Sequence, residues 1–271
     1  MFLGRSPLRH ASHLDYLKEL SPSNKIVFVE AEVSLISGID AACAQITTAE
    51  RKADYLCMSP GGMPFQGAVY TQEGLETCFA VSYYSKLRLV SNLLPLLNQS
   101  PKPRVLSILN GTKEKRINED DIGLEKKWSI VGVVDHTTLL TSLVFDYLAS
   151  NDEQKKPTLI HATPGFVNTV TERTTFPSKK DGLLWWAFVS VMQVVSGWVI
   201  RYFGMSLKES GERHAFHLKN DSYGPGSWRI DKHIVWDNSV LQEYQGRGWG
   251  EEVLDFTRWV WDKALTQDAR S

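Results

Sequence analysis

The sequence predicts an α/β fold in which helices cover both faces of a parallel sheet. Short apolar segments with strand character alternate with longer segments of helical periodicity, an order typical of βαβ units. Turn-forming residues follow the apolar segments, as in Ser59-Pro60-Gly61-Gly62 and Asn110-Gly111. The chain has 271 residues, of which 42% are hydrophobic, so it can bury a large core.

The first hundred residues predict three strands and three helices. Apolar or β-branched runs indicate the strands, and apolar residues at three- and four-residue spacing indicate the helices. Ser21-Pro22 ends the first helix, and the third stops near Pro101. The expected strands are Met1–Gly4, Lys25–Glu30 and Asp54–Met58, and the expected helices are Leu8–Leu20, Ile36–Ala49 and Leu75–Leu97.

The pattern continues to about residue 218 and then changes. Two further strands are expected at Arg104–Leu109 and Thr158–Ala162, and two helices at Ser129–Ala149 and Ser206–Leu218. The last part predicts an edge strand within Trp228–Trp236 and an amphipathic helix at Glu251–Leu265. We expect one domain over residues 1–271, with a helical lid or insertion over about 177–205 and a C-terminal extension over about 219–271.

The segment 183–203 is mostly apolar and about as long as a membrane-spanning helix. Polar residues interrupt it, and we therefore favour a helical lid, or an insertion that faces a second subunit, over an apolar pocket. A helix on the membrane surface and a membrane span remain the alternatives, so the peripheral membrane contact that we consider runs through 183–203.

The overall charge and the cysteines narrow the class of protein. The net charge is −1 and the isoelectric point is about 6.7, which gives no support for nucleic acid as a partner. There are three cysteines, an odd number with none close in sequence, so we expect neither a disulfide framework nor a zinc site. The first ten residues hold no long apolar run, so we expect no signal peptide and a cytoplasmic protein.

The strand order also predicts where a ligand binds. In open parallel sheets the ligand crevice lies beyond the carboxyl ends of the strands. In this chain those ends are Glu30–Val33, Met58–Gly62, Leu109–Gly111 and His161–Gly165. We expect the functional residues to lie there.

Five short segments, in this order, resemble the short-chain dehydrogenase/reductase family over about residues 1–218. The first three, Gly4-Arg5-Ser6, Glu30–Ser34 and Met58–Gly62, resemble the segments after the family's second, third and fourth strands. Asn92–Leu97 resembles the end of its fourth helix, and Pro164–Thr169 resembles the turn after its sixth strand. A sixth segment, Glu209–His214, resembles a subgroup of fungal members tied to secondary metabolism. The resemblance implies a Rossmann-like sheet with strand order 3-2-1-4-5-6.

The resemblance places residue 1 at the family's second strand, so the first strand and its glycine-rich phosphate-binding loop do not occur in the sequence. Without the first strand, which is central in the family's sheet, a gap remains between the second and fourth strands, and it could close in three ways. The second strand moves beside the fourth, another chain fills the gap, or the start is truncated.

The family's four chemical positions carry other residues in this chain. The tyrosine position falls at Trp128 or Ser129, and the lysine position at Gly132 or Val133. The serine position falls at Leu109 or Asn110, and the asparagine position at Ser82. Tryptophan offers an N–H donor without useful acidity. The resemblance therefore predicts a scaffold that has lost the family's redox chemistry.

Our first functional hypothesis is a non-redox enzyme that works without a nicotinamide cofactor. It would isomerise, cyclise, rearrange or eliminate an apolar intermediate of secondary metabolism, by orientation and hydrogen bonding. The alternative is an NADP(H)-dependent oxidoreductase, and the second alternative is an inert partner subunit. We also expect a homo-oligomer.

Eight residues are candidates for the site. His136 is the acid/base candidate because histidine titrates near neutrality, although a satisfied buried histidine is the simpler interpretation. Asn110 could donate an amide N–H to a substrate oxygen, or simply form an Asn-Gly turn. The predicted catalytic residues are His136, Asn110 and Ser129, and the predicted substrate-binding residues are Trp128, Ser59, His161, Trp185 and Phe188. No residue is assigned to a cofactor or a metal.

Overall fold

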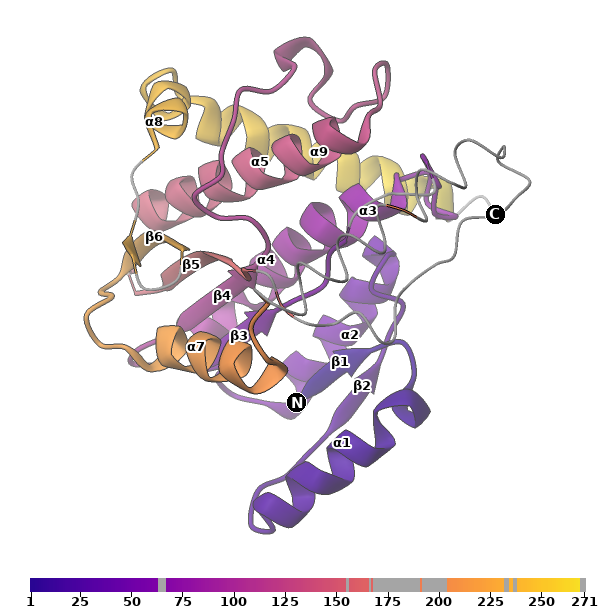
Figure 1. Cartoon of the computed structure of the whole chain (residues 1–271). Coiled ribbons are helices and arrows are strands. Elements are labelled where there is room, and N and C mark those ends of the chain that lie inside the picture. The colour runs from indigo at the N-terminus through magenta and orange to yellow at the C-terminus, as the bar shows by residue number, and fades with distance from the viewer. Residues whose placement is uncertain are drawn as a thin grey trace.

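The computed structural model describes residues 1–62, 67–154, 156–165, 167, 191, 204–231, 234–235 and 238–268. A sheet with helices on both faces forms the centre of the molecule (Figure 1). Four parallel strands and a short antiparallel edge strand pair in the order β3 (Tyr55–Met58), β4 (Arg104–Ile108), β5 (Thr158–Thr163), β6 (Gly226–Asp231) and β7 (Ile234–Val235). The predicted α/β class is confirmed.

Helices cover the two faces of this sheet unequally. One face carries α4 (Ser85–Leu97) and α5 (Ile130–Asn151), with α2 (Ile36–Ala49) against α4. The terminal helix α9 (Trp249–Asp268) packs outside α5 and also contacts α2 and α8 (Ser239–Gly246). The other face carries α7 (Leu207–Lys219), over a smaller apolar cluster that includes Leu106, Ile160 and Tyr223.

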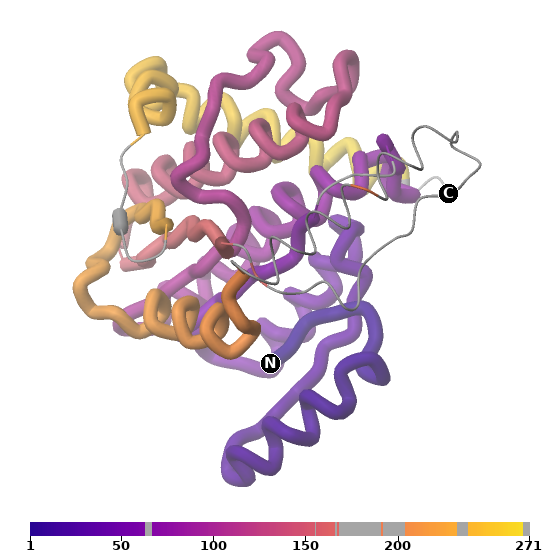
Figure 2. Tube along the Cα trace, in the orientation of Figure 1, coloured from indigo at the N-terminus to yellow at the C-terminus, as the bar shows by residue number. Residues whose placement is uncertain are grey.

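The first two strands stand apart from the main sheet. The strands β1 (Phe2–Gly4) and β2 (Phe28–Glu30) pair in parallel with each other, and α1 (Pro7–Leu20) connects them. This unit projects beside β3 near the N-terminus (Figure 2). Among the residues that the structure describes, no strand pairs with the second edge of β1 or of β3. The alternative in which the family's second strand moves beside the fourth is therefore wrong.

Two predicted elements are divided in the structure. The segment expected as one helix over Leu75–Leu97 consists of α3 (Thr77–Phe79), the π-helix η1 (Ala80–Tyr84) and α4. The expected edge strand within Trp228–Trp236 is β6, which is an internal parallel strand, followed by β7 at the edge. The short helices η2 (Glu119–Asp121) and α8 were not expected. The predicted lid lies outside the described residues, apart from its last two, Gly204 and Met205, and position 191.

A charged cluster joins three helices on the α2–α4 side. The Arg88 guanidinium donates to both oxygens of Asp40, over 2.6 and 2.7 Å, and the Asn92 amide donates to one of them over 2.7 Å. The guanidinium also lies 5.0 Å from the ring centroid of Trp261 on α9. This bidentate, partly buried pair is the geometry in which an ion pair contributes measurably to stability.

We expect Asp40→Asn to lower the free energy of unfolding by about 1–2 kcal/mol, because Arg88 would lose its charged partner while staying partly buried. Urea unfolding measures this change. The control is Asp15→Asn, which removes an exposed ion pair with Lys18 and should change stability by less than about 0.5 kcal/mol. Equal effects of the two substitutions would contradict the expectation.

Candidate functional site

The turns that follow β3, β4 and β5 lie side by side at the carboxyl edge of the sheet, because the three strands are parallel neighbours. Gly61, after β3, has φ +150°, and a Cβ built on it would lie 3.0 Å from the Leu109 side chain. The Thr163 hydroxyl donates to the Gly111 carbonyl and so ties the turn after β4 to β5. These contacts join the three turns, which we call the floor of the predicted crevice.

Asn110 and His161 meet in a buried network behind this floor. The Asn110 backbone N–H donates to His161 Nε2 over 3.4 Å. Ser142 Oγ donates to Glu114 Oε1 over 2.6 Å, so the proton on His161 Nδ1 points to Ser142 Oγ, 2.8 Å away. Burial and, to a smaller extent, the charges of Lys86 and Arg229 lower the pKa of His161 to about 3, so the ring is neutral. These contacts fix the turn after β4 and occupy both ring nitrogens.

Lys86 places an almost fully buried amine behind the same turn. Its side chain comes from α4, and the residue is 1% exposed. Nζ donates to the Ile108 carbonyl over 3.0 Å, and it lies at the longer distance of 3.4 Å from Ser107 Oγ. Burial lowers the pKa of Lys86 to about 7. Lys86 is therefore a proton donor or acceptor near neutrality, directly below the strand ends.

The π-helix η1 brings Ser82 to this edge. π-Helical turns are rare and often occur at functional positions. Ser82 is buried, its Oγ would lie 3.4 Å from a Cβ on Gly61, and its Oγ is 3.8 Å from Cys78 Sγ. Tyr83 and Tyr84, on the same turn, pack into the main core. The asparagine position of the resemblance is thus occupied by a small hydroxyl beside the turn after β3.

His136 does not share this network. The ring is 2% exposed, Nδ1 lies 2.9 Å from the Ile122 carbonyl, and Nε2 accepts the Asn118 backbone N–H over 3.1 Å. Burial lowers the pKa of His136 below its usual range. With both nitrogens bonded to backbone, the ring holds the 118–122 segment against α5, and no contact in the structure joins it to Asn110.

Trp128 and Ser129 begin α5. The Trp128 indole packs against the main core, and its Nε1 is buried without a hydrogen-bond partner in the described part of the chain. Ser129 is the N-cap of α5, and its Oγ accepts the Gly132 backbone N–H over 2.9 Å. Among the described residues, Trp128 therefore keeps an unpaired N–H donor, and Ser129 keeps the O–H donor of its hydroxyl.

Ser129→Ala should lower the free energy of unfolding by about 1 kcal/mol through loss of the N-cap, and Ser129→Asp should restore it because aspartate also caps helices. Denaturant midpoints of the three proteins test this. Unchanged stability together with a tenfold or greater loss of activity in Ser129→Ala would show that the hydroxyl acts on a substrate instead.

The remaining candidates are only partly described. Ser59 is exposed directly after β3, at the open edge of that strand. Trp185 and Phe188 lie outside the described residues. The three cysteines are free, as expected from their number and spacing.

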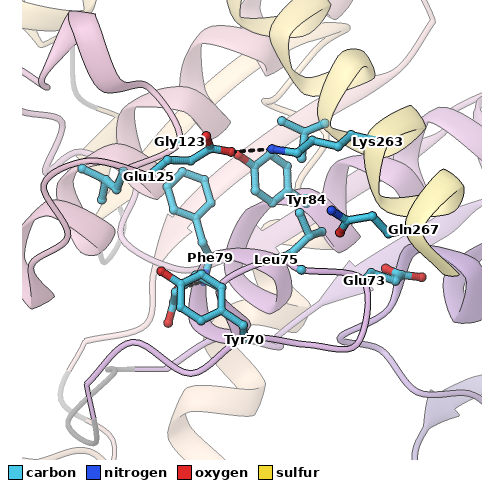
Figure 3. A pocket seen from close by; sticks show the side chains of 13 residues that line it. Tyr70, Glu73, Leu75, Phe79, Tyr84, Gly123, Glu125, Lys263 and Gln267 are labelled. Atoms are coloured by element: carbon cyan, nitrogen blue, oxygen red, sulfur yellow. Dashed lines mark hydrogen bonds and ion pairs between the residues drawn. The ribbon is translucent and has the colours of Figure 1, made fainter. Parts of the chain in front are cut away.

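A separate hollow of about 230 Å³ lies between α9 and the segments around residues 70–79 and 123–125 (Figure 3). Its charged groups already have partners. Glu73 accepts hydrogen bonds from the N-terminus of α2, Glu76 caps α3, and Glu125 pairs with Lys263 at 2.9 Å. None of the turns after β3, β4 and β5 lines it, so we do not assign the site to this hollow.

Three residues at the carboxyl edge were not among the candidates. Lys86 interrupts the apolar face of an amphipathic helix, which is a signal that the sequence does contain. Glu114 lies in the charged stretch before α5, and Arg213 lies within the Glu209–His214 segment quoted for the resemblance. Their burial depends on contacts between distant segments, which sequence spacing alone does not show.

Three features near the strand ends of the two sheets suit a nicotinamide dinucleotide. Gly61 would clash through a Cβ, and Gly62 would have no atom within 4 Å of one, so the backbone after β3 is open to close approach. Arg5, exposed directly after β1, carries a charge suited to a ribose phosphate. Arg213 Nη1 is buried without a partner beside Gly165. These arginine side chains and the glycines after β3 fit a nicotinamide dinucleotide.

Similarity to other proteins supports the same interpretation, although no family model matches the chain. The chain is 32% identical to "Oxidoreductase lepF" of Aspergillus flavus over 304 residues, which cover 96% of this chain and 83% of the relative. It is 36% identical to "Oxidoreductase AN1596" of Emericella nidulans and 40% identical to "NmrA-like family domain-containing oxidoreductase notO" of an Aspergillus species. These two alignments cover 82% and 79% of this chain but only 63% and 59% of the relatives.

Solved structures show the same fold at low sequence identity. The NADPH-bound carbonyl reductase from chicken fatty liver has a TM-score of 0.56 at 15% identity, over 86% of each chain. An NADPH-bound short-chain oxidoreductase from Pseudomonas aeruginosa, described as having an atypical catalytic center, has a TM-score of 0.55 at 15% identity. It covers 86% of this chain and 84% of its own.

The expected non-redox chemistry and the expected absence of a nicotinamide cofactor are therefore wrong. Three relatives that share 32–40% identity with this chain are named oxidoreductases, and this finding overturns both expectations. The expectation treated four substituted positions as proof of lost redox function. Those positions test one arrangement of catalytic groups, whereas hydride transfer depends first on holding the cofactor beside the substrate.

The parallel sheet, the glycine turns at its carboxyl edge and the relative aligned over most of both chains lead to one conclusion. The chain belongs to the short-chain dehydrogenase/reductase family.

Proposed function

We propose that this protein is a nicotinamide-dependent oxidoreductase that acts on a small organic substrate at the carboxyl edge of β3–β5. The observation that carries the proposal is the open glycine turn after β3, beside Ser82 and the turn after β4. It provides a backbone surface against which a flat ring can lie. The oxidoreductase names of the relatives support the same class of activity.

The bound cofactor would supply or accept a hydride. The chain's own residues would then hold the substrate and handle its proton. The Trp128 indole N–H can donate a hydrogen bond to a substrate oxygen, but it cannot deliver a proton at ordinary pH. Lys86, whose pKa is about 7, is the nearest described group to the Ile108 carbonyl that titrates near neutrality, so it can exchange a proton at this edge.

We also propose that Arg5 favours a cofactor with a ribose phosphate. Its side chain follows β1 directly and is exposed. An arginine at this strand end can pair with a 2′-phosphate, whereas a cofactor without that phosphate would gain little from it. The proposal therefore names NADP(H) as the cofactor.

The fluorescence of NADPH should increase on titration with the protein and should give a micromolar dissociation constant. Arg5→Ala should weaken NADPH binding about tenfold, equivalent to about 1.4 kcal/mol, and should leave NADH binding unchanged. The control is Arg9→Ala on exposed α1, which should change neither. Absence of NADPH and NADH binding at millimolar concentration would refute the proposed function.

A further inference from the structure

Arg213 directs a cationic group at the turn after β5. Its Nη1 would lie 3.4 Å from a Cβ on Gly165, two residues beyond the end of β5, where φ is +74°. Met205 meets the same turn, since its Cε would lie 2.9 Å from that Cβ. The glycine is what allows the guanidinium to reach the backbone here.

This guanidinium nitrogen is buried and has no hydrogen-bond partner in the described part of the chain. The neighbouring His214 is 8% exposed, and its Nε2 is likewise buried without a partner. Its Nδ1 lies 3.4 Å from Ser210 Oγ on the preceding turn of α7. Of these two atoms, Arg213 Nη1 is the one that lies beside the turn after β5.

Such an arrangement costs free energy unless a ligand completes it. A guanidinium stays charged at every accessible pH, and an unsatisfied buried donor costs about 1–3 kcal/mol, more when it is charged. Its planar pair of N–H groups matches the two oxygens of a carboxylate or a phosphate. An anionic oxygen group is therefore the ligand that this position fits best.

We propose that Arg213 forms an anion subsite beside the Pro164-Gly165 turn that receives a carboxylate or phosphate group. The inference rests on the proposed function for the surrounding site, since the turns after β4 and β5 adjoin through the Thr163–Gly111 contact. The anion is either a carboxylate of the substrate or a phosphate of the dinucleotide.

Thermal unfolding with anions alone tests the subsite without any turnover. The proteins are wild type, Arg213→Met and Lys208→Met, the last a matched control on α7 whose side chain is 86% exposed. The probes are pyrophosphate and benzoate, each at constant ionic strength adjusted with sodium chloride. At about a hundred times its dissociation constant, a bound anion should raise the melting temperature of wild type and Lys208→Met by roughly 5 °C.

Arg213→Met should lose this anion-dependent shift, and its melting temperature without anion should not fall, because the substitution removes a buried guanidinium nitrogen that has no partner among the described residues. An equal shift in all three proteins, or no shift in wild type with either probe, would overturn the proposal. If Arg213→Met does not fold, Arg213→Lys keeps the charge but loses the planar fork. It should then show less than half of the wild-type shift, and a full shift would overturn the proposal.

NADPH titration of the same proteins separates the two sources of the anion. Loss of both the pyrophosphate shift and NADPH affinity in Arg213→Met assigns the subsite to the cofactor. Loss of the benzoate shift with unchanged NADPH affinity assigns it to the substrate. An Arg213-dependent anion shift in a protein that binds no NADPH would refute the proposed oxidoreductase function and leave this subsite standing.

Discussion

Replacing Lys86 by methionine is expected to stabilise the protein by roughly 2–4 kcal/mol at pH 7. Methionine has a similar length and fills the same space without a charge. The lysine is 1% exposed, and its three N–H donors have two partners among the described residues, the Ile108 carbonyl at 3.0 Å and Ser107 Oγ at 3.4 Å. Burial lowers its pKa from 10.5 to about 7, and each unit of such a shift corresponds to 1.36 kcal/mol. Loss of the bond to Ile108 offsets part of the gain.

The stability that Lys86→Met gains over wild type should decrease as the pH rises. Below pH 7 the lysine is protonated in both the folded and the unfolded state, so the full cost of the buried charge is present. Between pH 7 and 10.5 the unfolded state keeps the proton that the folded state has released. Wild-type stability therefore rises by about 1.4 kcal/mol per pH unit from this group, while Lys86→Met lacks that dependence.

Urea unfolding of wild type and Lys86→Met at pH 6.5 and pH 9.5 measures the difference in stability between them. Contributions from groups that titrate in both proteins cancel in this difference. Lys263→Met is the control, since Lys263 is partly exposed and pairs with Glu125 at 2.9 Å. It should change stability by less than about 1 kcal/mol at either pH. A Lys86→Met protein that is less stable than wild type at both pH values would contradict the expectation.

Much of this fold could be predicted from local sequence patterns, because each strand and helix of residues 1–165 satisfies its own periodicity. The prediction failed where the apolar spacing continues although the backbone changes from α-helix to π-helix. Nothing in the run Leu75–Leu97 marks the π-helical turn, since it has no glycine or proline before Pro95 and its apolar spacing persists. The turn is stabilised by tertiary contacts, such as the bond from Trp261 Nε1 to the Tyr84 carbonyl over 3.2 Å.

The sequence also predicted which strand ends lie side by side, because strand ends in a parallel sheet meet at one edge. It did not predict the roles of individual residues. Asn110 bonds His161 directly, across 51 residues of sequence. Ser142 then links His161 to Glu114 through contacts that span 19 and 28 residues. His136 faces the 118–122 segment instead. Helical spacing shows which side chains share a face, and it does not show what that face contacts.

Gly111→Ala is expected to cost about 3 kcal/mol or more of unfolding free energy. A Cβ at this position would lie 2.1 Å from the His161 carbonyl oxygen and 2.6 Å from its carbonyl carbon. These atoms belong to the backbone of β5, which pairs with β4 on one side and β6 on the other. β5 cannot move away from the new Cβ without breaking its hydrogen bonds to β4 or β6. We therefore expect the substitution to cost more free energy than the usual 1–3 kcal/mol for overpacking a core.

Gly211→Ala is the matched control for the same chemical change. Gly211 lies within α7, and a Cβ there would have no atom within 4 Å. Alanine should stabilise the helix at that position by up to about 1 kcal/mol, because glycine is a poor helix former. The two substitutions should therefore move urea midpoints in opposite directions.

The Gly111 substitution also tests whether the turn after β4 belongs to the site. The Gly111 carbonyl accepts a hydrogen bond from the Thr163 hydroxyl, and the backbone N–H of Asn110 donates one to His161. Displacement of β5 would therefore shift the turns after β4 and β5 together. NADPH affinity should then fall along with stability in Gly111→Ala and stay unchanged in Gly211→Ala. A Gly111→Ala protein that loses less than about 1 kcal/mol would show that β4 and β5 are not held this closely, and the junction inferred between the turns after β4 and β5 would be wrong.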